Sequence, residues 1–249
     1  GVVAAIGTDV TRFAVGDEVF GIGREAYVEY ARVLESKLAR KPVNLTFEQA
    51  AVTPVSGLTA LQALRDKGRV QPGQEVLIIG ASGGVGTFAV QLAKAFGARV
   101  TGVCSTTKID LVRTLGADRV IDYTREDFAD GGQRYDIVLD IGGNSPLARL
   151  RRALVRSGTL VVVGGETGGR WLGGFDRTLR ALALSPFVSQ QLTGLVNSEN
   201  AADLGVLAHL IDAGKVTPVV DRTYPLAETG KAIRYLEEGH ARGKVAITI

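Results

Sequence analysis

The sequence predicts an α/β fold built around a doubly wound parallel sheet, and three observations lead to this prediction. The apolar, β-branched run Glu75 to Ile79 leads directly into the glycine-rich stretch Gly80 to Gly86. Behind this stretch, apolar residues recur at helical spacing from Val85 to Phe96. Further runs of Val, Ile and Leu alternate with helical segments, which indicates strands that are buried on both faces of a sheet.

The glycine-rich stretch is the strongest local signal. A strand, a glycine turn and a helix in succession present free backbone N–H groups and the positive end of a helix to a phosphate. Positions 81, 83 and 86 fit a relaxed Rossmann fingerprint, with alanine in the first place. We therefore expect the turn to bind a dinucleotide through five residues: Ser82, Gly83, Gly84, Val85 and Gly86.

The first 70 residues are expected to be mostly β-structure followed by two helices. Valine-rich and aromatic runs between glycine turns predict short strands over residues 2–6, 18–21 and 27–33. Lys41-Pro42 ends this pattern. Two helices are then predicted over residues 47–51 and 57–66, and Thr46 is the expected N-cap of the first.

After the glycine turn, strands and helices alternate. Apolar runs predict further strands over residues 99–104, 119–122, 135–140, 158–163, 187–196, 219–223 and 244–249. Helical spacing predicts helices over residues 107–115, 145–154, 177–184, 199–213 and 227–238. The run at 187–196 is the expected sixth strand of the parallel sheet.

Composition bounds the class of protein. The 249 residues are 45% hydrophobic and 22% charged, which is typical of a soluble globular chain, and the net charge of +3 gives no argument for nucleic acid. A single cysteine, Cys104, excludes an internal disulfide and a cysteine-based metal cage.

No apolar run has membrane-spanning length and no signal peptide is visible, so a cytoplasmic setting is expected. The chain opens at Gly1 within what reads as a strand, and we expect a fragment that lacks its N-terminal part.

The end of the second strand predicts the type of cofactor. In such folds an acidic residue about 20 positions after the first glycine binds a free ribose 2′-hydroxyl. Residues 102–108 contain no acid, but they offer the hydroxyls of Ser105, Thr106 and Thr107 and the ammonium of Lys108. Hydroxyls and a cation suit a 2′-phosphate, which predicts NADP(H). Alternatively, Ser105 to Thr107 caps the next helix, and both roles are compatible.

Several segments together resemble one known superfamily. The resemblance is carried by Gly57-Leu58-Thr59-Ala60, Ala81 to Gly86, Cys104-Ser105-Thr106, Leu115 to Asp118 and Val120 to Tyr123. These look like the medium-chain dehydrogenase/reductase superfamily, and within it the zinc-independent quinone oxidoreductase (zeta-crystallin-like) branch. Residues 7–21 resemble the GroES-like β-barrel domain of that family. The resemblance implies a truncated GroES-like substrate domain at residues 1–50, an NADP-binding Rossmann domain at 51–214, and a return to the substrate domain at 215–249.

The resemblance also implies roles for individual residues. Ser105, Lys108 and Tyr123 would lie near the adenosine 2′-phosphate. Gly142 and Gly164 would follow the dinucleotide, while Thr59, with a possible positioning role, and Phe187 would approach the nicotinamide. His240 or Arg242 would touch a cofactor phosphate. Alternatively, Tyr123 is a packing residue at a strand end, and Phe187 belongs to the core or to an interface.

The sequence offers no zinc site. Where zinc-dependent relatives carry a later cysteine ligand, this chain has Pro54-Val55-Ser56, and His209 and His240 are far apart. No acid/base pair stands out, so the catalytic residues are unknown. We expect an NADPH-dependent, zinc-independent enzyme that reduces quinones or α,β-unsaturated carbonyls. The alternatives are an enoyl reductase, an alcohol dehydrogenase relative, or a non-catalytic dinucleotide-binding protein.

The expected partners are few. They are a small carbonyl or quinone substrate and a second copy of the chain, with neither nucleic acid nor membrane. In the branch that the chain resembles, dimers commonly form through an edge strand, for which residues 187–196 are the candidate. The glycine-rich loop from Thr167 to Phe175, which contains Trp171, is expected to be either a lid or a surface turn.

Overall fold

The computed structural model describes residues 1–143, 145–164 and 175–249. Residues 167–174 of the expected lid, including Trp171, therefore lie outside the described residues. The chain divides into two compact units. We call residues 59–196 the central unit, and residues 1–58 together with 197–249 the flanking unit.

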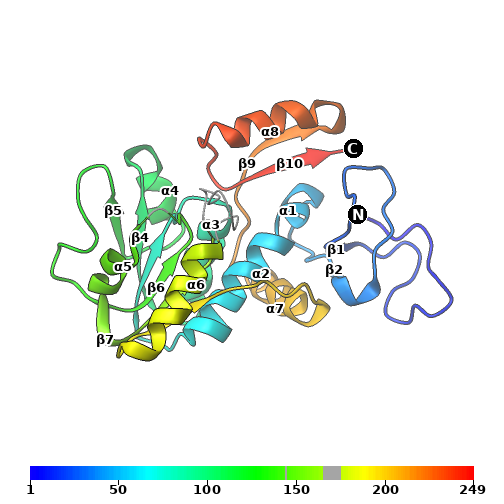
Figure 1. The fold of residues 1–249 in the computed structure, drawn as a ribbon. Helices are drawn as coiled ribbons and strands as arrows, with labels where there is room; N and C mark the ends of the chain where they lie inside the picture. Colours follow the sequence, from blue (N-terminus) through cyan, green and yellow to red (C-terminus); the bar gives the residue numbers. More distant parts are fainter. Residues whose placement is uncertain (144, 165–174) are drawn as a thin grey trace. The chain divides into compact units, whose positions relative to one another are not determined.

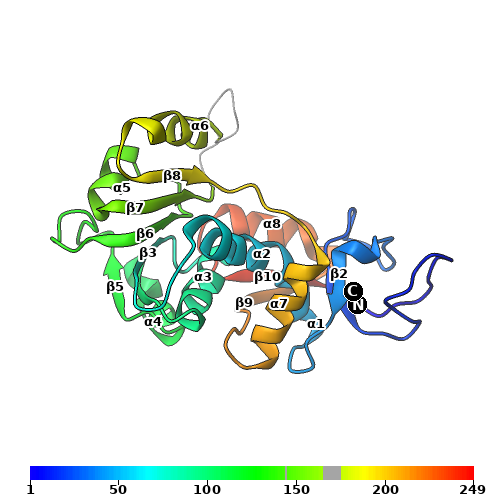
Figure 2. The ribbon, with the colours of Figure 1, turned by 90° about the horizontal axis from the view of Figure 1, so that it is seen from below.

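A six-stranded sheet forms the middle of the central unit (Figures 1 and 2). Its strands lie side by side in the order β5 (Arg119–Asp122), β4 (Arg99–Cys104), β3 (Glu75–Ile79), β6 (Tyr135–Asp140), β7 (Leu154–Val162) and β8 (Gln191–Gly194). Every neighbouring pair is parallel. The chain moves outward in one direction from β3 to β5 and in the other from β6 to β8. The strand order thus reverses between β3 and β6, which is the doubly wound arrangement that the sequence predicts.

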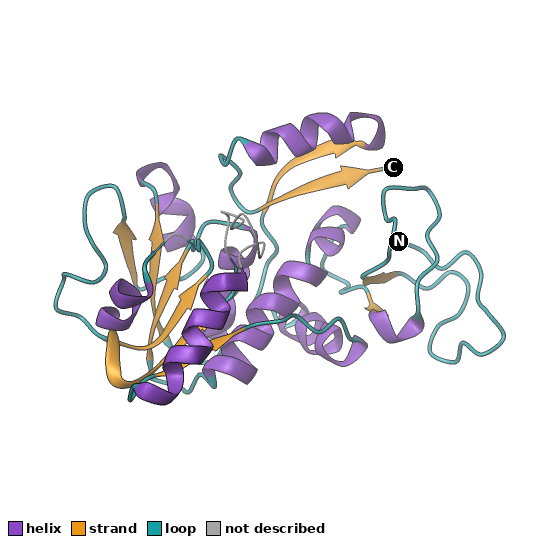
Figure 3. Cartoon of the chain, in the orientation of Figure 1, coloured by secondary structure: helices purple, strands orange, loops and turns teal. Residues whose placement is uncertain are grey.

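Helices cover both faces of this sheet, as Figure 3 shows by element type. On one face, α5 (Leu147–Ala153) and α6 (Phe175–Leu184) add Leu150, Ala153 and Ala181 to a core with Leu77 and Val138. The other face carries α3 (Gly84–Ala95), which packs on β3 and β4, and α4 (Ile109–Thr114). Burial on both faces explains why the strands read as continuous apolar runs.

The remaining helical segments of the central unit are short or irregular. Helix α2 (Pro54–Gln62) enters from the flanking unit and continues as a π-helical segment, Ala63–Gly68. Two 3₁₀ turns, Thr106–Lys108 and Ser185–Phe187, precede α4 and β8.

The flanking unit combines two small sheets with helices. Strands β1 (Val19–Gly21) and β2 (Leu38–Arg40) are antiparallel, while β9 (Val220–Pro225) and β10 (Lys244–Thr248) are parallel. The helices are α1 (Phe47–Val52), α7 (Ala201–Asp212) and α8 (Thr229–Glu237), with 3₁₀ turns at Glu35–Lys37 and Leu226–Glu228. Thr46 caps α1 as predicted, because its side chain accepts a hydrogen bond from the Gln49 backbone N–H.

Three expected strands are wrong or too long. Residues 2–6 form only an isolated bridge between Val2 and Glu18, and residues 27–33 form no strand. In the second of these segments Tyr30 is 80% exposed, so its aromatic residues have no buried face that would stabilise a strand. The expected strand 187–196 begins only at Gln191, because Pro186 and Phe187 belong to a 3₁₀ turn. Among the described helices, none has the length and apolar character needed to cross a bilayer.

Candidate functional site

The turn between β3 and α3 is shaped by two glycines that cannot be replaced without strain. Gly80 has a φ of +86°, and a Cβ there would lie 3.1 Å from the backbone nitrogen of Gly142. A Cβ at Gly86 would lie 2.8 Å from the Cα of Ala81, and closer still to the Gly80 carbonyl oxygen. The N–H groups of Gly80 and Ala81 both donate to the Val103 carbonyl. Glycine is therefore required for the tight turn and for the close approach of α3 to it.

Gly83 serves a different purpose from these two. Its backbone is extended, with φ −83° and ψ 179°, a conformation that any residue adopts. A Cβ there would meet only the Gly80 carbonyl oxygen, at 3.5 Å. The fold therefore does not require glycine at position 83, and the space beside it can take a ligand atom.

The first turn of α3 presents unpaired donors beside this space. Within the part of the chain that the structure describes, the N–H groups of Gly84, Val85 and Gly86 have no protein acceptor, and no side chain caps the helix. Orphan donors and the positive end of a 12-residue helix favour an anion. The turn also lies where the strand order reverses, at the carboxyl ends of β3 and β6, where ligands of such sheets bind.

A second group of predicted residues gathers at the carboxyl ends of β4 and β5. Ser105 follows β4 at an N-cap position, but its side chain makes no capping hydrogen bond, so the capping alternative is not what the structure shows. The Lys108 backbone N–H donates to the Ser105 carbonyl at 3.0 Å. Tyr123 follows β5, donates its N–H to the Cys104 carbonyl at 3.1 Å, and is 61% exposed. An exposed ring does not pack at the strand end, which removes the alternative role of Tyr123.

Asp122, which the sequence analysis did not single out, lies between these residues. Its side chain is buried and accepts hydrogen bonds from the hydroxyls of Thr106 and Thr124, at 2.5 and 2.7 Å. These hydrogen bonds, from Thr106 first and then Thr124, lower the pKa of Asp122, so the carboxyl group stays ionised. The Thr106 hydroxyl, a predicted cofactor contact, is thus already committed as a donor within the protein.

A buried ion pair holds the loop after β6. The carboxylate of Asp140 is fully buried, accepts a hydrogen bond from Arg177 Nη2 at 2.6 Å, and also accepts one from the Gly143 N–H at 3.2 Å. Burial raises the pKa of Asp140, and the charge of Arg177 opposes this effect. The Gly142 N–H donates to the Ile79 carbonyl at 3.2 Å. These contacts fix the loop of Gly142 beside the glycine turn.

The other predicted residues are placed as follows. Gly164 follows β7 at the same edge of the sheet. A Cβ added at this position would lie 3.7 Å from the Ile141 carbonyl oxygen. Thr59 is buried on α2. His240 and Arg242 belong to the flanking unit, in the turn between α8 and β10.

Phe187 does not join the group. Its 3₁₀ turn precedes β8, so Phe187 lies at the amino-terminal edge of the sheet, opposite the glycine turn. Its side chain is 84% exposed, so it is not part of the core either. The expected nicotinamide contact is displaced because the strand starts four residues later than the apolar pattern predicts.

Metal-ligating and nucleophilic side chains are sparse. Cys104 is 2% exposed, and burial, followed by the nearby charge of Asp122, raises the pKa of its thiol to about 11. A thiol of this kind is neither an activated nucleophile nor a ready metal ligand. Among the described residues, no three His, Cys, Asp or Glu side chains are grouped so as to hold a metal ion. His209 lies on α7 of the flanking unit, far along the chain from Cys104.

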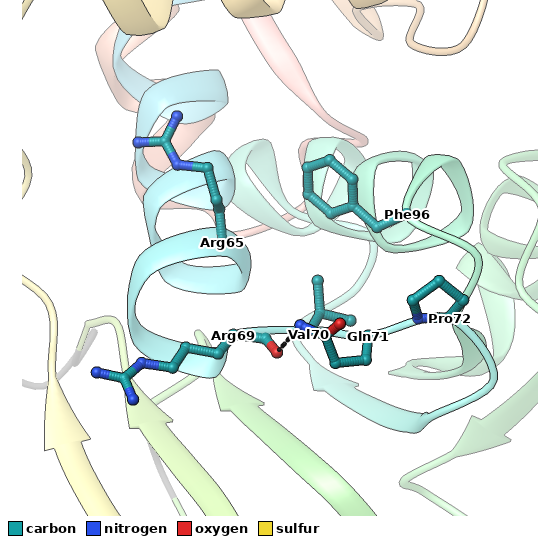
Figure 4. Close-up of a pocket in the computed structure, with 6 residues that line it drawn as sticks. All are labelled: Arg65, Arg69, Val70, Gln71, Pro72 and Phe96. Carbon is teal, nitrogen blue, oxygen red and sulfur yellow. Dashed lines mark hydrogen bonds between the residues drawn. The ribbon is translucent and has the colours of Figure 1, made fainter.

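A groove of about 490 Å³ opens elsewhere on the central unit (Figure 4). It is lined by Arg65, Arg69, Val70, Gln71, Pro72 and Phe96. These residues precede β3 or follow α3, so the groove lies at the amino-terminal edge of the sheet. The Arg65 guanidinium is hydrogen-bonded to the Asp66 carboxylate. The groove is therefore distinct from the site at the carboxyl edge, where the orphan donors lie.

Together, the sheet topology and the amide-lined turn define a dinucleotide-binding α/β protein. Comparison with known proteins narrows the class. The family described as zinc-binding dehydrogenase matches residues 115–247. The mouse mitochondrial NAD(P)H oxidoreductase RTN4IP1 is 35% identical over 287 aligned positions, which cover all of this chain and 68% of the relative.

Further relatives agree with this match. The chloroplastic NADPH-dependent alkenal/one oxidoreductase of Arabidopsis thaliana is 34% identical, over 99% of this chain and 61% of the relative. The solved structure of the quinone oxidoreductase from Coxiella burnetii superposes with a TM-score of 0.86 at 32% identity, over 100% of this chain and 77% of that one. The chain belongs to the medium-chain dehydrogenase/reductase family.

Proposed function

We propose that this chain is an NADPH-dependent reductase that transfers hydride to a quinone or an α,β-unsaturated carbonyl compound without zinc. The observation that carries the proposal is the set of orphan N–H groups at Gly84, Val85 and Gly86, beside the space at Gly83. The relatives support it, since their names combine NAD(P)H with quinone or alkenal substrates.

The residues present fit a phosphorylated dinucleotide. The orphan amides would hold its pyrophosphate, and Ser105, Lys108 and Tyr123 would surround the 2′-phosphate. Two observations support this assignment: the Ser105 hydroxyl makes no capping hydrogen bond, and the Tyr123 ring is exposed. Gly142 and Gly164 would let the ligand pass close to the backbone of the loops after β6 and β7.

The chemistry needs little from acidic or basic side chains. When bound, NADPH supplies the hydride that an electron-poor carbon accepts. The chain binds the dinucleotide at the sheet edge, orients it through fixed backbone donors, and limits its position by the loop that Asp140 and Arg177 hold. Thr59 is proposed to have a positioning role, because it lies buried on α2 after the Gly57-Leu58 pair.

The donor set does not fit zinc. The chain has one cysteine, and its thiol is buried in β4 with a raised pKa. Pro54-Val55-Ser56 offers no sulfur ligand where the resemblance expects one. The description of the family as zinc-binding therefore does not carry over to these residues, and no step is assigned to a metal.

Domain roles and assembly are proposed on the same resemblance. Residues 1–50 and 215–249 would belong to a GroES-like substrate domain, and residues 51–214 to the nucleotide domain. The compact units divide the chain at other positions, since residues 51–58 and 197–214 belong to the flanking unit. Among the strands of the described residues, β8 ends the sheet and pairs only with β7. Its free edge supports a homodimer, as does the exposure of Phe187 beside it.

A cytoplasmic setting is proposed from composition, although two relatives are named mitochondrial and chloroplastic.

The test is oxidation of NADPH, followed at 340 nm, with a panel of quinones and enones and with NADH in parallel. We expect turnover with at least one electrophile, a preference for NADPH, and no loss of activity after dialysis against a chelator. A Gly83→Ala protein tests the site itself: the added Cβ fills the space beside the orphan amides, so NADPH affinity should fall while stability stays close to wild type. Binding of NADPH without turnover would favour a non-catalytic role, and loss of activity with chelator would favour an alcohol dehydrogenase relative.

A further inference from the structure

The Asp122 carboxylate is an unusual feature of the site because both of its oxygens are used inside the protein. Asp122 closes β5, opposite Cys104 of β4, and is 5% exposed. Its Oδ2 accepts from Thr106 Oγ1 at 2.5 Å, and its Oδ1 accepts from the backbone N–H and the Oγ1 of Thr124, at 3.0 and 2.7 Å. An ionised carboxylate that is committed to hydroxyls in this way is not the type of acid that binds a free ribose 2′-hydroxyl.

The two threonines belong to loops that follow different strands. Thr106 comes directly after Ser105 and two positions before Lys108, in the loop after β4. Thr124 comes directly after Tyr123, in the loop after β5. The hydroxyl oxygens of the two threonines are 3.2 Å apart, so one carboxylate joins both loops at one point.

Each residue proposed to hold the 2′-phosphate is thus within two positions of a threonine that is bonded to Asp122. The backbone bond from Tyr123 to Cys104 links the strand ends, but it does not reach Lys108. Removing the carboxylate would take away three hydrogen bonds at the point where the loop of Ser105 and Lys108 meets the loop of Tyr123, and would leave the 3.2 Å contact between the two threonine hydroxyls. The three side chains that must converge on one phosphate would then be less firmly positioned, which lowers the affinity for the 2′-phosphate.

The negative charge of Asp122 opposes the positioning effect of its hydrogen bonds. A carboxylate repels a phosphate, although here its charge is offset by the two hydroxyls and by Arg125, whose Nε lies 3.6 Å away. Both oxygens point at donors of the protein, which leaves the positioning effect as the larger one. We infer that Asp122 is a positioning residue that sets the preference of this site for a 2′-phosphorylated dinucleotide over an unphosphorylated one. This inference rests on the proposed function.

Two substitutions separate geometry from charge. Asp122→Ala removes the hydrogen bonds that the carboxylate makes to both loops, whereas Asp122→Asn keeps the shape and can still accept from Thr124 and donate to the Thr106 hydroxyl. Titration calorimetry would measure the Kd of NADPH and of NADH for both variants. We expect the alanine variant to bind NADPH about tenfold more weakly and NADH less than about threefold more weakly, because only the phosphate contacts are lost. The asparagine variant should bind NADPH within about threefold of wild type.

The matched control is Asp118→Ala, at the position directly before the first residue of β5. Asp118 accepts from the Val100 N–H at 2.7 Å and pairs with Lys94 at 2.8 Å, so its loss also costs stability, but far from the proposed phosphate contacts. We expect its NADPH:NADH affinity ratio to stay unchanged. If Asp122→Ala does not fold, Thr124→Val takes its place. This variant removes one hydroxyl and should weaken the binding of NADPH but not that of NADH.

The outcomes distinguish a failure of the proposed function from a failure of the role inferred for Asp122. Wild-type protein that binds no NADPH contradicts the proposed function itself. Wild-type protein that binds NADPH, together with an unchanged affinity ratio in Asp122→Ala or Thr124→Val, overturns the inference about Asp122 alone. An asparagine variant that binds NADPH as weakly as the alanine variant would also overturn the inference, because the shape of the side chain at position 122 would then not determine the affinity.

Discussion

Alanine at position 86 tests how closely α3 approaches the glycine turn. The added Cβ would lie 2.7 Å from the carbonyl carbon and 2.8 Å from the Cα of Ala81, and closer to the Gly80 carbonyl oxygen. All three are backbone atoms, and the hydrogen bonds from Gly80 and Ala81 to the Val103 carbonyl fix them. Because carbon atoms pack at about 3.5–4.0 Å, the start of α3 must move by about 1 Å.

The magnitude follows from two opposing terms. Overpacking of this kind costs about 1–3 kcal/mol, and alanine in a helix recovers up to about 1 kcal/mol relative to glycine. The contact is with backbone rather than with a flexible side chain, so we take the upper part of the overpacking range and expect a net loss of about 2 kcal/mol. In a chain of this size each kcal/mol lowers the Tm by about 2–4 °C, so the Tm should fall by about 4–8 °C.

The assay is urea unfolding followed by far-ultraviolet circular dichroism, with calorimetry for the Tm. The matched control is Gly205→Ala in the middle of α7, where a Cβ would meet nothing within 4 Å. The same substitution should there raise the free energy of unfolding by about 0.5–1 kcal/mol. A Gly86→Ala protein as stable as wild type would refute the close approach of α3 to the turn.

Three further predictions concern other contacts. Thr46→Ala should lower the free energy of unfolding by about 1 kcal/mol in urea melts, because the hydrogen bond that the Thr46 hydroxyl accepts from the Gln49 N–H is lost; Thr46→Ser should retain most of this stability. The thiol of Cys104, with a pKa of about 11, should resist iodoacetamide at pH 8 in the folded protein and react fully in urea, and rapid native alkylation would contradict its burial. Arg177→Met should cost about 3 kcal/mol in the same melts, because it leaves Asp140 buried and unpaired; adding Asp140→Asn should restore part of that loss, and additive losses would contradict the pairing.

The sequence predicts the sheet well because its signal is local. β3 coincides with the predicted Glu75 to Ile79, since a strand buried on both faces shows as an uninterrupted apolar run. The glycine turn is predicted for a similar reason: its geometry needs Gly80 and Gly86 whatever surrounds it. Outside the sheet, runs such as residues 27–33 read as strands but stay irregular, because apolar spacing does not provide a pairing partner.

The polar part of the site depends on strand order, which the sequence does not display. Asp122 and Thr106 are 16 positions apart, and they meet only because β4 and β5 are neighbours. Asp140, at the end of β6, and Arg177, on α6, meet across 37 positions because α6 packs on the strands beside β6. An acidic residue at the end of a strand, followed by a threonine two positions later, is the signal that could have drawn attention to Asp122.

The most direct test of the account is a crystal structure of the chain with NADPH. We expect the pyrophosphate against the N–H groups of Gly84, Val85 and Gly86, with the 2′-phosphate between Ser105, Lys108 and Tyr123. A dinucleotide bound at the opposite edge of the sheet, or a glycine turn filled by protein atoms, would contradict the account.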